Sequence, residues 1–524
     1  MKRNLYVALS VVAILVAAGL MGWWIWTARV PAGDASQGQV LYEKNCAACH
    51  GLDGNGKGEA AYLLQPKPRN FRAGEFRLVS SQNRQPTRED LFRVIANGMP
   101  GTPMPPWAHL AESDRWEMVD YILKLNWQGW VEKGMSLGDA RAEAEKYASE
   151  ITQPGDPIPL PSEPAVTPRG LRQGRAYYLT VCAKCHGEDG KGKFDPTWRT
   201  AEGYPTWARN LSEGVFKGGR EGEQLYLRFF TGMPGTPMPS GELPGEQVWR
   251  VVQYVQSLSD PAAQEQARIR REEIVVKRLQ SLPAGPEDAA WDTVPELRLA
   301  LMPLWWHEGY INAVRVKAAH DGQRLAFRLE WNDATRDAEG IRQQSFPDGA
   351  AVQLAANVSP PLFAMGAAGE AVNIWHWKAL WDEDQKQFQD VATAFPGMVA
   401  DSYYGSEKGW QAEPLEDALY RPADAARNLI ASPHRTSTVE DANAAGFGSL
   451  TSQAAEKQNV EGVSRWEDGV WRLQLVRDLQ ASDAGDVPLR AERAASVAFA
   501  IWDGSAGDRN GQKSVSIWNT LKLE

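Results

Sequence analysis

The 524-residue chain is long for one hydrophobic core, and a prior of roughly 150 residues per domain suggests about three units. Hydrophobic residues make up 43% and charged residues 23%, which indicates a folded protein without collagenous or disordered bias. The net charge of -10 argues against nucleic acid as a partner, because phosphate binding needs clustered lysines and arginines.

The N-terminal segment has Lys2 and Arg3 in front of a run without charge, residues 5–26. This run is long enough to cross a ~30 Å hydrocarbon core as a helix. A cleaved signal peptide is the competing interpretation, but its apolar region is typically only ~7–15 residues long. We therefore expect a single-pass anchor over residues 1–30 in the inner membrane, with the domains that follow on the periplasmic side.

Two C-x-x-C-H motifs contain every cysteine of the chain. The cysteines and histidines of the two motifs are Cys46, Cys49, His50, Cys182, Cys185 and His186. This motif is the signature of covalent haem c attachment, with the histidine as proximal ligand of the iron. A redox dithiol or half of a zinc site would leave the trailing histidine unexplained in both motifs. We therefore predict two haems c.

The motifs belong to an internal repeat whose halves begin at Gly38 and Gly174. Each half contains the octet GMPGTPMP, at residues 98–105 and 232–239, followed by an amphipathic stretch with helical spacing. This order resembles class I cytochromes c, which are small all-α domains with histidine and methionine as axial ligands.

The resemblance implies one methionine ligand from each octet, because a thioether on the second haem face raises the potential. We favour Met104 and Met238, and Met99 and Met233 are the reserve candidates. The alternative is that all four methionines fill the core.

The last 250 residues or so have a different pattern. RLAFRLEW, at residues 324–331, alternates apolar and polar side chains and follows INAVRVKA across the turn HDGQ, which predicts a hairpin. DGVWRLQLVRDL, SVAFAIWDG and SVSIWNTLKLE alternate in the same way. Short strands separated by turns favour a β-sandwich.

The stretches FAMGAAGEAVNIWHWKALW, GVWRLQLVRDL and FAIWDGSAGDRNGQKSVSIW resemble the haem b-binding γ subunit of ethylbenzene dehydrogenase and of the related dimethylsulfide dehydrogenase, selenate reductase and chlorate reductase. In that family a β-sandwich holds one haem b between a methionine and a lysine. The resemblance implies Met365 and Lys513 as ligands, with Lys457 in reserve. On chemistry alone, His376 is a rival ligand of the haem b iron. The chain departs from the family pattern by an insertion around residues 382–436.

Together these inferences predict a multidomain chain with an N-terminal transmembrane helix, two all-α cytochrome c domains and a C-terminal, mainly-β sandwich domain that binds haem b. The expected segments are the anchor at 1–30, cytochrome c domain 1 at 31–130, a helical and proline-rich linker at 131–168, cytochrome c domain 2 at 169–262 and the haem b domain at 263–524.

Three haems in one anchored chain are typical of an electron-transfer protein. The resemblance implies the subunit of a periplasmic molybdoenzyme, such as a nitrite or nitrate oxidoreductase, with an iron-sulfur subunit and a molybdenum catalytic subunit as partners. The two haems c would exchange electrons with a c-type cytochrome, the quinone pool or an oxidase. No residue of this chain is assigned a catalytic role. The alternatives are a self-contained dihaem enzyme of the peroxidase type, and a haem-based carrier or sensor without a molybdenum partner.

Overall fold

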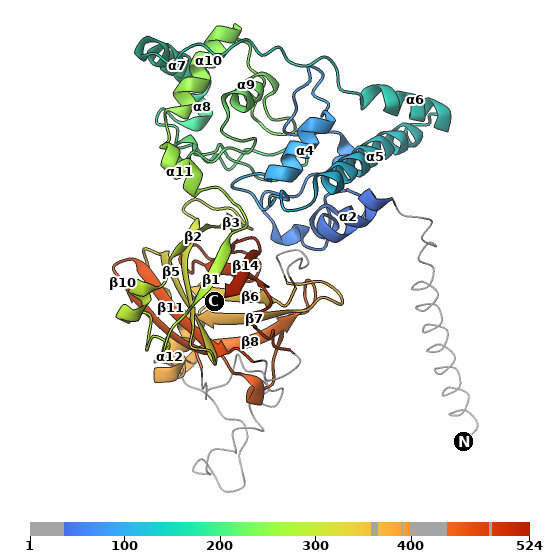
Figure 1. The fold of residues 1–524 in the computed structure, drawn as a ribbon. Coiled ribbons are helices and arrows are strands. Elements are labelled where there is room, and N and C mark those ends of the chain that lie inside the picture. The colour runs from blue at the N-terminus through green and yellow to red at the C-terminus, as the bar shows by residue number, and fades with distance from the viewer. Residues whose placement is uncertain (1–35, 358–364, 390, 399–436, 481–484) are drawn as a thin grey trace, which may run out of the picture.

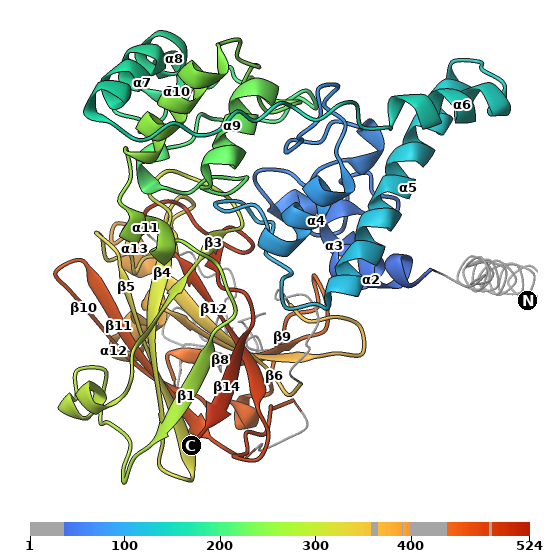
Figure 2. The same ribbon diagram turned by 45° about the horizontal axis from the view of Figure 1, so that its top comes forward.

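The computed structural model describes residues 36–357, 365–389, 391–398, 437–480 and 485–524. Two helical domains lie side by side at one end of a large β-sheet domain (Figure 1). A view turned by 45° preserves this arrangement, so both helical domains adjoin the β-sheet domain (Figure 2).

The transmembrane helix predicted at the N-terminus is not supported. Across the described part of the chain, no helix combines the length and the apolar composition that crossing a bilayer requires. The predicted anchor at residues 1–30 lies outside the described residues. The described residues form two helical domains and a C-terminal β-sheet domain.

The two helical domains have a similar order of elements, although η1 of the first domain has no counterpart in the second. The first contains α2 (Gln37–Asn45), α3 (Ala47–His50), η1 (Ala61–Leu63), η2 (Phe71–Ala73), α4 (Arg88–Asn97), α5 (Glu112–Ser136) and α6 (Arg141–Ile151). The second contains α7 (Pro168–Val181), α8 (Ala183–His186), η3 (Leu211–Glu213), α9 (Gly222–Thr231), α10 (Gly245–Gln256) and α11 (Pro261–Gln266).

In each helical domain a glycine lets the first helix cross a later helix at close range, α2 on α5 and α7 on α10. A Cβ on Gly38 of α2 would lie 2.2 Å from the carbonyl oxygen of Glu117 in α5. A Cβ on Gly174 of α7 would lie 1.9 Å from the carbonyl oxygen of Arg250 in α10. Both distances are below van der Waals contact, so any larger residue would push the helices apart.

The chain between the two repeats does not hold them apart. After α6 it is extended, as its prolines predict, but it packs on both domains: the Ile158 amide donates to the carbonyl of Ser80 at 2.9 Å, and Trp249 Nε1 donates to that of Pro161 at 2.8 Å. The two helical domains also touch directly, because Arg228 Nη1 donates to the carbonyl of Arg77 at 2.7 Å.

The described strands of the C-terminal domain form one 14-stranded sheet, in the order β10-β11-β5-β4-β1-β14-β12-β6-β7-β8-β9 with β2, β3 and β13 off this path. The predicted hairpin is present as antiparallel β4 and β5. The strands are β1 (Glu273–Arg278), β2 (Leu297–Ala300), β3 (Met302–Pro303), β4 (Ala313–His320), β5 (Arg324–Asn332), β6 (Gly349–Ala355), β7 (Val372–Lys378), β8 (Val439–Ala444), β9 (Thr451–Ser452), β10 (Glu461–Glu467), β11 (Val470–Asp478), β12 (Ala495–Trp502), β13 (Ser514–Val515) and β14 (Asn519–Leu523).

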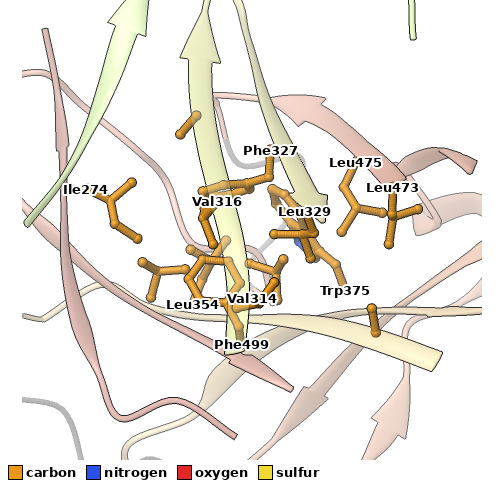
Figure 3. Packing of buried hydrophobic residues seen from close by; sticks show 14 of the residues in the cluster. Ile274, Val314, Val316, Phe327, Leu329, Leu354, Trp375, Leu473, Leu475 and Phe499 are labelled. Atoms are coloured by element: carbon orange, nitrogen blue, oxygen red, sulfur yellow. The ribbon is translucent and has the colours of Figure 1, made fainter. Parts of the chain in front are cut away.

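The main core of this domain draws side chains from both halves of the strand order, so the sheet folds over on itself (Figure 3). Phe327 of β5 contacts Trp375 of β7 and Phe499 of β12, with ring centroids 5.9 and 6.0 Å apart. Edge-to-face aromatic pairs of this kind stabilise a core beyond their buried area.

The carboxylates of Asp333, Asp348 and Asp503 lie close together, and we expect them to make the stability of the domain depend on pH. Burial, and after it the neighbouring Asp348, raise the pKa of Asp333. Asp333 Oδ2 is buried and has no hydrogen-bond partner among the described residues. The stabilisation by the protonated form is present below the unfolded pKa of ~3.9 and is lost as the pH rises through the raised folded value.

We therefore expect the Asp333→Asn variant to have a free energy of unfolding about 1–3 kcal/mol higher than that of the wild type at pH 8. At pH 4 we expect the two free energies to be nearly equal. Denaturant unfolding followed by tryptophan fluorescence at both pH values measures this difference. The matched change Asp292→Asn at an exposed position should have no such pH-dependent effect. An equal effect of Asp333→Asn at pH 4 and pH 8 would contradict the prediction.

Candidate haem sites

Each helical domain encloses a pocket between its C-x-x-C-H motif and its methionine loop. In the first domain a cavity is lined by Cys46, Cys49 and His50, and by Met99 and Met104. Apolar side chains form most of the remaining wall. The structure thus brings all five predicted residues of this domain to one cavity.

The second domain repeats this arrangement around a cavity of its own. Its lining includes Cys182, Cys185 and His186, together with Met233 and Met238.

The two histidines are oriented by the same backbone hydrogen bond. His50 Nδ1 lies 2.9 Å from the carbonyl oxygen of Arg69, and His186 Nδ1 lies 3.0 Å from that of Arg209. Only a protonated Nδ1 can donate to a carbonyl, so Nε2 is left as the unprotonated nitrogen that can ligate a metal. Burial lowers the pKa of His50 to about 4 and also lowers that of His186, which favours the neutral ring.

The two methionine loops have the same internal hydrogen bonds. The Met99 amide donates to the Met104 carbonyl at 3.0 Å, and the Met233 amide donates to the Met238 carbonyl at 3.2 Å. In each loop a threonine hydroxyl closes the turn, donating to the carbonyl of Met99 or Met233 at 2.7 Å. Because the backbone is closed in this way, both methionines of each loop are held at the pocket.

These features fit a haem in each helical domain. A pair of thiols, a neutral buried imidazole and a thioether on the same apolar cavity are the groups that covalent attachment and two-sided iron ligation need. The fit rests on the donor set and on the orientation of each histidine.

The segment that carries the candidate ligand Lys513 is connected by hydrogen bonds to the wall of the first pocket. The Leu304 amide donates to the Lys513 carbonyl at 2.8 Å, and the Leu304 carbonyl accepts from the Gln65 amide at 2.9 Å. Gln65 stands between Leu64 and Pro66, which line the first cavity. Two backbone hydrogen bonds therefore connect the Lys513 segment to the wall of that cavity.

Lys513 and Met365 lie at one apolar cluster of the β-sheet domain. Lys513 Nζ lies 4.5 Å from the ring centroid of Trp502, which belongs to this cluster, and Met365 packs against it. The cluster also includes several alanines of β6, β8 and β12. Cys49 packs against the same cluster, so the first pocket and these two residues share a wall.

The amine of Lys513 and the thioether of Met365 are the ligand types that the resemblance implies for haem b. Burial lowers the pKa of Lys513 to about 8, which makes the neutral amine that ligation requires accessible. Met365 has φ 62°, a left-handed conformation that is uncommon for a residue with a side chain.

The two other candidate ligands of haem b are Lys457 and His376. Lys457 is in η7 (Ala455–Lys457), after β9. His376 of β7 packs against Trp381 and Trp502, with ring centroids 5.6 and 5.0 Å apart, and its Nδ1 is 3.8 Å from a Glu440 oxygen. These contacts are those of a packed core histidine.

Among the basic residues of the pockets that were not singled out from the sequence, two pairs correspond: Arg69 and Arg77 line the first cavity, and Arg209 and Lys217 line the second. They occupy matching positions in RNFRAGEFR, residues 69–77, and RNLSEGVFK, residues 209–217. Extending the internal repeat across these nine positions would have found them.

The family comparisons divide the chain in the same way. Residues 33–122 match the family described as cytochrome C oxidase, cbb3-type, subunit III, and residues 171–259 match the cytochrome c family. Residues 288–514 match the ethylbenzene dehydrogenase family.

Three curated proteins are similar to somewhat less than half of the chain. A protein of Haloferax mediterranei described as a respiratory nitrate reductase heme subunit is 27% identical over 45% of this chain and 67% of its own length. The dimethylsulfide dehydrogenase subunit gamma of Rhodovulum sulfidophilum is 26% identical over 45% of this chain and 73% of its own. The chlorate reductase subunit gamma of Ideonella dechloratans is 26% identical over 46% of this chain and 80% of its own.

These family matches cover both helical domains and most of the β-sheet domain. The chain is a haem-binding electron-transfer cytochrome that joins two cytochrome c domains to a C-terminal domain of the ethylbenzene dehydrogenase family.

Proposed function

We propose that this chain is the γ-type electron-transfer subunit of a molybdenum-containing oxidoreductase and carries two haems c and one haem b. The observation that carries the proposal is the shared wall: Cys49 of the first cytochrome pocket and Met365 pack against one apolar cluster. Three redox sites would then belong to one contiguous body.

The residues of the chain hold and tune the cofactors. His50 and His186 would ligate through Nε2, since each Nδ1 is engaged by a backbone carbonyl. Met104 and Met238 would ligate from the opposite wall, and their thioethers would raise the potentials. Each haem, when bound, supplies one-electron oxidation and reduction.

In the β-sheet domain, Met365 and Lys513 would hold the haem b, and burial would exclude water from it. Desolvation and the iron together favour the neutral amine of Lys513, so a ligand that is charged at pH 7 when exposed becomes available. Electrons would pass between this site, next to an iron-sulfur subunit, and the two cytochrome c domains, which exchange with a c-type cytochrome, the quinone pool or an oxidase.

The γ subunits of dimethylsulfide dehydrogenase and chlorate reductase among the relatives support this assignment. A nitrite or nitrate oxidoreductase as the specific complex is a narrower proposal, supported by the similarity to a nitrate reductase heme subunit. The periplasmic location remains a prediction.

Affinity purification of the tagged chain from its native cells tests the assignment. We expect it to co-purify with subunits that contain molybdenum and iron-sulfur clusters, and we expect the substrate of that complex to change the oxidation state of the haems. A chain that purifies alone, without molybdenum, and itself turns over a small oxidant such as a peroxide would contradict the proposal.

The methionine assignment predicts a difference within each loop. In the holoprotein, Met104→Ala should open one haem c to carbon monoxide and lower its potential, because the thioether ligand is lost. Met99→Ala is the matched control and should leave both haems c closed. Carbon monoxide difference spectra and a redox titration measure both effects, and the reverse pattern would give the ligand role to Met99.

The lysine assignment predicts a selective loss of haem b. Lys513→Ala should remove most of the haem b while both haems c remain, because the latter are covalently attached. Lys457→Ala is the matched control and should retain all three haems. Pyridine haemochrome spectra of the purified variants distinguish the two types of haem, and loss of haem b from the Lys457 variant alone would reverse the assignment.

A further inference from the structure

The segments 69–77 and 209–217, which carry these basic residues, fold alike in the two cytochrome domains. Asn70 caps η2 by accepting from the Arg72 amide, and Asn210 caps η3 by accepting from the Ser212 amide, both at 3.0 Å. In each segment the arginine before the asparagine provides the carbonyl that orients the proximal histidine. A second basic residue follows eight positions later, Arg77 in one domain and Lys217 in the other.

The side chains of the two arginines cross the interface between the domains. Arg209 Nη2 donates to the carbonyl of Gly101, in the methionine loop of the first domain, at 3.3 Å. Arg69 reaches the methionine loop of the second domain, where a Cβ on Gly235 would lie 3.3 Å from Arg69 Nη1. Arg69 Nη1 also pairs with Glu202 of the second domain at 2.7 Å. Each arginine therefore lines one pocket and contacts the loop that closes the other.

The positive charge at this interface is only partly paired. Arg69 Nε and Nη2 and Arg77 Nε are buried without a hydrogen-bond partner among the described residues. Burial lowers the pKa of Lys217 well below its ordinary value, and Arg77, Arg209 and Arg69 lower it further. Two carboxylates pair with Arg69: Glu75 lies 3.9 Å from Arg69 Nη1, and Glu202 forms the ion pair described above.

Burying unpaired hydrogen-bond donors and positive charges costs free energy unless an anion binds to them. The cavities on either side hold no carboxylate among the residues that line them. A porphyrin of the haem type carries two carboxylates of its own, and arginine is the side chain that matches carboxylate geometry best.

We propose that Arg69, Arg77, Arg209 and Lys217 form one shared carboxylate site that binds propionates of the haems in both cytochrome pockets. The proposal rests on the proposed function in requiring a haem c in each domain. Because the arginines span the interface, the propionate edges of both haems are bound by one set of charges. Each cation therefore contributes to both redox potentials.

Neutral variants of the intact holoprotein test this sharing. Arg77→Gln belongs to the first domain and Lys217→Gln to the second. We expect each to lower both haem c potentials, because a lost positive charge destabilises the more negative reduced state. Arg175→Gln, an exposed position of the second domain, removes the same charge outside the site and should move neither potential.

Spectroelectrochemical titration of the two haems c gives the readout, with the haem content of each variant measured alongside. If each neutral variant moves a single potential, or none, the shared site is contradicted. A wild-type chain without haem c would instead refute the proposed function, which separates the two failures.

A charge-conserving change covers the case in which the neutral variants do not load haem. Arg77→Lys replaces a forked donor with a point charge, so it should shift the propionate bending bands in resonance Raman spectra of the holoprotein. Unchanged bands in that variant would overturn the assignment of Arg77 to the site.

Discussion

The hydrogen bond from a proximal histidine to an arginine carbonyl is the constraint on which both cytochrome pockets depend. At 2.9 Å for His50 and 3.0 Å for His186, it fixes the neutral tautomer and leaves Nε2 for the iron. The side chain of the same arginine extends across the domain interface. One short segment thus sets both the ligand and the charge around it.

Both cytochrome domains also contact the β-sheet domain near these segments. The first cytochrome domain shares a hydrogen-bonded backbone connection with Lys513 through Gln65 and Leu304. The second cytochrome domain docks on the β-sheet domain through Trp207, which lines its cavity and stacks on Trp306 with ring centroids 3.9 Å apart. Both pockets therefore contact the domain that carries the candidate haem b ligands.

Local patterns in the sequence predicted much of this. The C-x-x-C-H spacing and the repeated octet identify groups that one covalent haem brings together, so they indicate a cavity without any knowledge of packing. Strand alternation predicted the β4 and β5 hairpin for the same local reason. Lys513, by contrast, was named through family resemblance alone, because a lysine far from any motif carries no chemical signal until its burial is known.

The remaining features depend on contacts between distant segments. The crossing of Arg69 and Arg209 between domains, and the packing of the proline-rich stretch against Ser80, arise only when both repeats are folded together. The apolar run at the N-terminus illustrates the opposite error, since hydropathy alone predicted an anchor that the described structure does not support.

The haem content of the intact, purified chain tests the central claim most directly. A pyridine haemochrome spectrum, normalised to chain concentration, separates haem c from haem b. The arrangement of the two cysteine pockets and of Met365 and Lys513 predicts two haems c and one haem b per chain. Two haems c without haem b, in protein with fully loaded cytochrome domains, would contradict the role given to the β-sheet domain and to its shared wall with the first pocket.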